Sequence, residues 1–83
     1  MEDYFRAKNY IGLNLLKKDK NRESNKYYKS LRGEVSDYYD YKMEGIPLAH
    51  EIYRNLALSE TKLNNVSEAL NLLNSTRVWL RSS

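Results

Sequence analysis

The sequence predicts an all-α fold of four helices in two antiparallel hairpins, forming a single helical domain over residues 1–83. Three observations support this. Apolar residues recur at intervals of three and four, and no window shows the strict alternation of a strand. Breakers and polar clusters divide the chain into four segments. The two halves also repeat one spacing of small and large residues at an offset of 45 positions, so that Gly12 falls on Ala57.

The predicted helices cover about residues 2–18, 22–43, 47–63 and 66–81, and the two hairpins cover 5–43 and 47–83. The turns are expected at Asp19-Lys20-Asn21, at residues 44–46 and at Asn64-Asn65, since these stretches are polar or contain glycine.

Each helix start or interior carries a further signal. Pro47, the only proline, follows Gly45 and is expected in the first turn of the third helix. Asn65 is expected to be the N-cap of the fourth helix, because Glu68 three residues later completes a capping-box arrangement. Gly12 lies within the first helix, where glycine costs about 1 kcal/mol against alanine, so it predicts a close helix approach. Gly33 is expected to bend or weaken the second helix.

The apolar positions define which faces are buried. The second helix carries an aromatic stripe, in which Tyr28 is expected in the core and Tyr27 is left open. The fourth helix is expected to present one apolar face and, around Leu72 and Trp79, a second one that stays exposed and marks an interface. The first of these faces comprises Val66, Ala69, Leu70, Leu73, Thr76 and Leu80.

The repeated spacing is carried by small residues that let the helices of a hairpin cross closely. Ser24 falls on Ala69 at the same offset, and Tyr28 falls on Leu73. In both halves the small residue of the first helix precedes that of the second by the same distance.

Residues 50–83 carry a set of large, small and turn residues at fixed spacing, namely Tyr53, Leu56-Ala57, Asn64-Asn65-Val66, Ser67-Glu68-Ala69-Leu70 and Leu73. With these residues the segment resembles one unit of the tetratricopeptide repeat family, which has a 34-residue period. Residues 5–38 fit a degenerate copy, with a second helix about eleven residues longer than the family's. The resemblance implies a scaffold or peptide-binding role without catalysis.

Composition narrows the function classes. The chain has no cysteine, which excludes disulfides and thiolate metal sites and favours a cytoplasmic location. No apolar run approaches the roughly 20 residues that cross a bilayer, so no membrane partner is expected. His50, the only histidine, is expected on a helix surface, and Asp37, Asp40 and Glu44 on a solvated face. We therefore expect no catalytic residues, no metal and no cofactor.

Charge is unevenly distributed along the chain. The net charge is +3, and residues 1–32 carry nine Lys and Arg against four acids, whereas residues 33–83 carry five against seven. This asymmetry suggests an anionic partner or a head-to-tail self-contact, and a solvated helix face is the plainer interpretation. An alternative function is nucleic-acid association through a basic patch, whose candidate residues are Lys17, Lys18, Lys20, Arg22 and Lys26.

The expected function is non-catalytic protein–protein interaction, as an adaptor, an assembly factor or a subunit of a larger complex, including a homodimer. Binding is expected in the groove between the first and third helices and on the terminal face around Leu72, Thr76 and Trp79. A peptide-sensing fragment of a bacterial regulator and a fragment without a partner remain alternatives. Tyr38 and Tyr39 are expected either to bind protein or to pack on the third helix, and the cations expected to bind carboxylates are Lys8, Lys17, Arg54 and Arg77.

Overall fold

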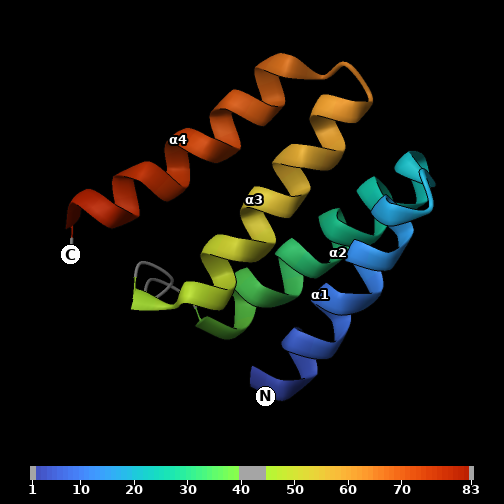
Figure 1. Ribbon diagram of the computed structural model, residues 1–83. Helices are drawn as coiled ribbons and strands as arrows, with labels where there is room; N and C mark the ends of the chain where they lie inside the picture. The colour runs from blue at the N-terminus through green and yellow to red at the C-terminus, as the bar shows by residue number, and fades with distance from the viewer. Residues whose placement is uncertain (1, 40–44, 83) are drawn as a thin grey trace.

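The computed structural model describes residues 2–39 and 45–82, with side chains described as far as residue 77. This part of the chain forms two antiparallel hairpins, which confirms the predicted all-α fold (Figure 1). The predicted end of the second helix at residue 43 lies outside the described residues. The helices are α1 (Glu2–Lys17), α2 (Asn21–Tyr39), α3 (Pro47–Lys62) and α4 (Val66–Ser82).

The helices form a row in which α2 lies between α1 and α3, and α4 lies at the outer edge (Figure 1). Helix α1 also touches α3, whereas α4 packs against α3 alone within the described residues. Among the described side chains, the hydrophobic core is concentrated in the first three helices, and α4 contributes two members to it. The core residues are Phe5, Leu16, Tyr28, Leu31, Val35, Leu48, Ala49, Ile52, Tyr53, Leu56, Ala57, Ala69 and Leu72.

The turns that close the two hairpins have the same backbone conformation. Asp19 and Asn64, 45 positions apart, both adopt a left-handed conformation, with φ of 58° and 66°. Asp and Asn tolerate this region better than other non-glycine residues because their short polar side chains bond locally.

The hydrogen bonds of these turns repeat as well. The amide of Lys20 donates to the carbonyl of Leu15 at 3.0 Å, and the amide of Asn65 donates to the carbonyl of Glu60 at 2.8 Å. Each bond closes a Schellman motif, which satisfies the last carbonyls of the preceding helix. The offset inferred from side-chain spacing is thus present in the backbone.

Gly12 lies at the closest crossing of the first hairpin, as its position predicted. A Cβ added to Gly12 would lie 2.6 Å from ring atoms of Tyr28, whose side chain is fully buried. The hydroxyl of Ser24 donates to the Gly12 carbonyl at 3.2 Å and joins α1 to α2 at the same place. Gly33 has no neighbour within 4 Å of the added Cβ, and α2 continues through it without interruption.

Both predicted helix starts are confirmed. Pro47 occupies the first turn of α3, as expected, and Ile46 is its N-cap. Helix α4 begins at Val66, and the Asn65 carbonyl accepts from the Ala69 amide at 3.1 Å, so Asn65 holds the N-cap position. The predicted capping box is wrong, because the Asn65 side chain donates to Glu60 Oε2 at 2.7 Å and makes no hydrogen bond with Glu68.

Candidate interaction surfaces

Helix α4 presents a row of large aliphatic side chains to solvent. Val66, Leu70 and Leu73 are 57%, 55% and 42% exposed. Their spacing of four and three residues places them on one side of the helix. We call these three residues the α4 stripe.

The face that α4 buries is not the one that the sequence predicted. Leu72, Thr76 and Ala69 are buried, so the expectation that Leu72 and Thr76 form an exposed terminal face is wrong. Leu72 is 4% exposed because α4 turns this side toward α3, which leaves Leu70 and Leu73 outside. The side chain of Trp79, the third predicted member, lies outside the described residues.

The corresponding face of α2 is covered. The offset of 45 positions pairs Leu70 with Asn25 and Leu73 with Tyr28. Asn25 is buried where it bonds to Ser59 and Glu60 of α3. Tyr28 is buried against α1, where its ring meets Gly12 and its hydroxyl bonds to Asn9. No described helix takes the place of α3 over the α4 stripe.

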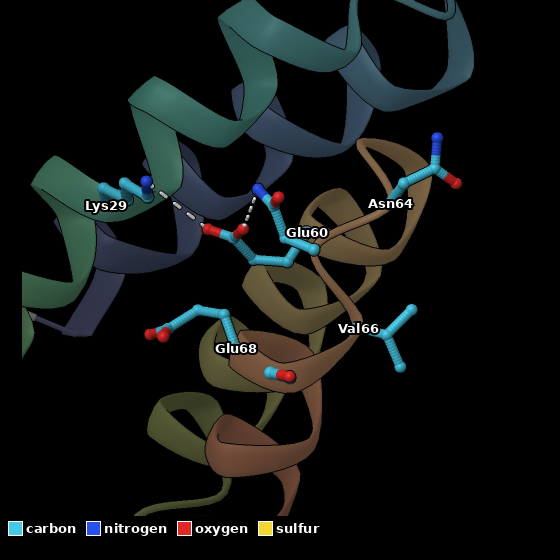
Figure 2. A pocket seen from close by; sticks show the side chains of 7 residues that line it. Lys29, Glu60, Asn64, Val66 and Glu68 are labelled. Atoms are coloured by element: carbon cyan, nitrogen blue, oxygen red, sulfur yellow. Dashed lines mark hydrogen bonds and ion pairs between the residues drawn. The ribbon is translucent and has the colours of Figure 1, made fainter.

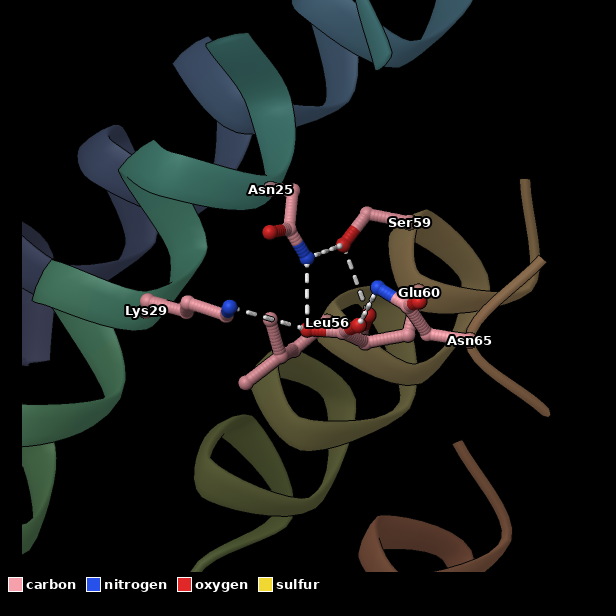
Figure 3. A network of polar contacts seen from close by, with 6 residues as sticks. All are labelled: Asn25, Lys29, Leu56, Ser59, Glu60 and Asn65. Carbon is pink, nitrogen blue, oxygen red and sulfur yellow. Dashed lines mark hydrogen bonds and ion pairs between the residues drawn. The ribbon is translucent and has the colours of Figure 1, made fainter. Parts of the chain in front are cut away.

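A buried polar network joins α2 to α3 at this point (Figure 3). Asn25 Nδ2 donates to Glu60 Oε1 at 2.8 Å and lies 3.0 Å from Ser59 Oγ. Lys29 Nζ lies 3.5 Å from Glu60 Oε1 and pairs with it from the α2 side. The sequence did not predict this network, although Ser59 and Glu60 follow Leu56 by three and four residues and therefore share its apolar face.

The network fixes the charge of a buried carboxylate. Glu60 is 1% exposed, and burial by itself raises its pKa. Hydrogen bonds from Asn25 and Asn65, with the nearby Lys29 ammonium, outweigh that effect and hold the pKa of Glu60 below its ordinary value. Glu60 is thus ionised at neutral pH and accepts hydrogen bonds from both hairpins.

Three residues of the network, Lys29, Glu60 and Asn65, also border a hollow of about 510 Å³ beside the α3–α4 turn (Figure 2). Figure 2 shows Lys29 reaching across it toward Glu60, while Glu68 extends from α4. Glu60 is already paired with Lys29 and with Asn65. We therefore interpret these residues of the hollow as structural, because they hold the α3–α4 turn against α2.

Lys8, predicted to bind a partner's carboxylate, is already paired within the first hairpin. Its Nζ lies 3.0 Å from Glu34 Oε2, and the Tyr4 hydroxyl donates to Glu34 Oε1 at 2.8 Å. Contact with Tyr4 and the bond to Glu34 raise the pKa of Lys8, and hydrogen bonds from Tyr4 and Lys8 lower the pKa of Glu34. Lys8 thus points toward α2 rather than into a groove between α1 and α3.

The remaining predictions for the side of the molecule formed by α1 and α3 concern the groove between these helices and two arginines. The two helices touch directly where Asn55 Nδ2 donates to Asn9 Oδ1 at 2.9 Å. Arg54, on α3, and Arg77, on α4, are exposed and have no ion pair within the described residues. Both remain available for a partner's carboxylate.

The aromatic cluster at the end of α2 packs on α1. The ring centroids of Tyr38 and Tyr39 lie 5.5 and 5.8 Å from that of Phe5. Tyr39 is half-buried, whereas Tyr38 is exposed at the edge of a hollow that Phe5 also lines. The cluster thus packs on Phe5 of the first helix, and Tyr38 keeps an open side.

The predicted basic patch is solvent-exposed around the α1–α2 turn. Tyr28 is unavailable for stacking on a base, because it is fully buried and its hydroxyl lies 2.8 Å from Asn9 Oδ1. Tyr27 is half-buried against the core. The patch would therefore attract a nucleic acid through its charges, without Tyr28 stacking on a base. Its exposed residues are Lys17, Lys18, Lys20, Arg22 and Lys26.

The remaining expectations concern His50, metal ligands and membrane-crossing helices. His50 is buried, so its predicted place on a helix surface is wrong. Among the residues that the structure describes, no three His, Cys, Asp or Glu residues are grouped as metal ligands. None of the helices, over their described lengths, is long and apolar enough to cross a membrane.

Comparisons of the chain with protein-family models, with curated proteins and with solved structures gave no match.

Proposed function

We propose that this protein is a non-catalytic protein-interaction module, acting as an adaptor, an assembly factor or a subunit of a complex, and that it binds its partner through the α4 stripe. One observation carries the proposal: among the described helices α4 packs against α3 alone, while it presents Val66, Leu70 and Leu73 to solvent. A contiguous apolar row of this kind on a small protein marks an interaction site.

The spacing of the stripe favours a helical partner. Residues at i, i+4 and i+7 form a ridge that fits a groove on a second helix. Arg77, one turn beyond Leu73, supplies a cation that can pair with a carboxylate at the rim of such a contact. The resemblance to tetratricopeptide repeats supports the same proposal, because repeats of this type bury their faces by stacking hairpin on hairpin.

A displayed library of amphipathic helical peptides tests this function. Peptides selected on the native chain are expected to bind the Leu70→Asp/Leu73→Asp variant at least about 100-fold more weakly, since burying two leucines contributes about 3 kcal/mol or more. The matched control is Leu58→Asp, which changes a leucine of α3 that is 45% exposed. Selected peptides that depend on Leu58 and ignore the stripe would move the binding surface to α3.

Nucleic-acid association is the second candidate, favoured by the exposed cations around the α1–α2 turn. It predicts binding to a single-stranded oligonucleotide that weakens steeply with salt. Changing Lys17, Lys18 and Lys20 together to alanine would abolish that binding, whereas the Leu70→Asp/Leu73→Asp variant would retain it. Binding without salt dependence would remove this candidate.

A further inference from the structure

We infer that the partner of the α4 stripe is α1 of a second copy of this chain. Copies would stack head to tail with the geometry that joins α2 to α3 inside one copy. This inference rests on the proposed function and names its partner.

The internal repeat defines the geometry. Helices α1 and α3 open the two hairpins, and α2 and α4 close them, with the same turn between each pair. Inside one chain the closing helix α2 is covered by the next opening helix, α3. The equivalent contact for α4 requires another opening helix, and α1 of a second copy is one.

Both faces that this contact requires are open. On α4 they are Leu70 and Leu73, as described above. On α1 the position equivalent to Leu56 is Ile11, which is 48% exposed, whereas Leu56 is completely buried under α2. Leu15, at the position equivalent to Glu60, is partly exposed.

One pair of side chains differs in a matched way between the contact inside the chain and the proposed contact between copies. Inside the chain the contact includes the buried hydrogen bond between Asn25 and Glu60. The equivalent positions of the contact between copies are Leu70 and Leu15, so both polar partners are replaced by leucine. Replacing only one of them would leave a buried polar group without a partner, which is costly, whereas replacing both produces an apolar contact.

Net charge does not drive this stacking, because α1 and α4 each carry one more cation than acids. The contact therefore rests on apolar side chains, and a close approach of two cations has to be neutralised locally. Inside one chain, Arg32 of α2 lies close enough to Tyr53 of α3 to lower the pKa of that tyrosine. Arg77 is the α4 residue equivalent to Arg32. Arg77 would therefore approach Lys8, the residue equivalent to Tyr53. Glu34 already neutralises Lys8 and offers its carboxylate nearby.

The two surfaces differ, so the contact does not close on two copies. A contact between α4 of one copy and α1 of the next leaves a free α4 and a free α1 at the two ends. Association is expected to continue beyond the dimer, either into rings or into open chains, as the protein concentration rises.

Two single-face variants test the arrangement by sedimentation from micromolar to millimolar concentration. Leu70→Glu removes the α4 surface, and Ile11→Lys removes the α1 surface; both positions are exposed, so the folds are expected to survive, as circular dichroism would verify. Each variant alone is expected to be monomeric. An equimolar mixture is expected to form a one-to-one dimer that does not grow, because it contains one intact α4 and one intact α1. Leu58→Lys is the control and is expected to associate like the native chain.

A paired substitution tests the contact at its centre. Leu70→Asn and Leu15→Glu are each expected to weaken association by at least about tenfold. Both changes in one chain restore the Asn–Glu pair between copies, and association is expected to recover.

Three results would overturn the inference. They are a native chain that stays monomeric at every concentration, an Ile11→Lys variant that still dimerises through two α4 stripes, and a mixture of the single-face variants that stays monomeric. The first would leave the proposed function standing if peptides that depend on the stripe were selected.

Discussion

The two hairpins share one backbone plan and differ in what covers them. Asp19 and Asn64 adopt the same left-handed backbone conformation in the two turns, and the turns make equivalent hydrogen bonds. Helix α2 is enclosed by α1 and α3, whereas α3 is the one described helix that packs against α4. Asn25 is consequently buried and its equivalent Leu70 exposed, which is the reverse of what polarity predicts. The comparison teaches that burial here depends on the neighbouring helix as well as on residue type.

The largest effect is expected from truncating the equivalent pair Tyr28 and Leu73. Tyr28→Ala leaves a cavity in the core and removes the contact with Asn9, so it is expected to lower the free energy of unfolding by about 3–5 kcal/mol. Leu73→Ala is expected to change it by no more than about 0.5 kcal/mol in dilute solution, since the side chain is exposed. Urea unfolding measures both, and equal losses would mean that α4 is covered.

The next largest effects are expected at the two helical glycines, where the same substitution should change stability in opposite directions. Gly12→Ala is expected to lower the free energy of unfolding by about 1–3 kcal/mol, because the added Cβ meets the buried ring of Tyr28. Gly33→Ala adds a methyl to open space on α2 and is expected to raise it by about 0.5–1 kcal/mol. Thermal unfolding followed by circular dichroism distinguishes the signs. A Gly12→Ala protein as stable as the Gly33→Ala protein would refute the close crossing.

The polar network between the hairpins predicts a dependence on pH. The pKa of Glu60 is lower in the folded chain than in the unfolded one, so unfolded chains bind the proton first as the pH falls. The stability that ionised Glu60 contributes is complete at neutral pH and declines below the ordinary pKa of a glutamate. It is lost once the pH falls below the folded pKa.

Glu60→Gln is expected to remove that part of the pH dependence and to lower the free energy of unfolding at neutral pH by about 1–3 kcal/mol. Glu68→Gln, an exposed change at the same hollow, is the matched control and is expected to have an effect within about 0.5 kcal/mol. Urea unfolding at a series of pH values tests this. Identical slopes for Glu60→Gln and the native chain would contradict the assigned role of the network.

The smallest effect is expected at the outer pair of the first hairpin. Lys8→Met removes the ion pair with Glu34, which is partly exposed and therefore weak. The loss is expected to be smaller than that of Glu60→Gln and to disappear at high salt, because ions screen exposed charges. A loss that persists at high salt would show that Lys8 supports the hairpin by packing instead of by charge.

The sequence predicted the backbone of the molecule well because small residues and turns act locally. Gly12 and Ala57 indicated the offset of 45 positions, and the hydrogen bonds of both turns follow it. The orientation of α4 was harder to predict. Leu72 lies away from the side that Leu70 and Leu73 share, and both sides are apolar, so periodicity alone allows more than one buried face. The choice depends on how α4 meets α3, which is a tertiary property.

The buried polar residues were missed for a related reason. Asn25 and Glu60 belong to types that are usually exposed, and His50 to a type of intermediate burial, so residue type alone does not place them in the core. Glu60 is buried because Asn25 and Asn65 meet it from separate parts of the chain. Its place on the apolar face of α3, one turn beyond Leu56, was the available signal.

Amide hydrogen exchange at several protein concentrations tests the central claim, that α4 carries the uncovered counterpart of the covered α2 face. In dilute solution we expect amides of α2 to be strongly protected and those of α4 to exchange much faster, since α4 has a single packing neighbour in the part of the chain that the structure describes. As the concentration rises, protection is expected to increase in α4 and α1 together, with α2 unchanged. Equal protection of α2 and α4 in dilute solution would contradict the claim.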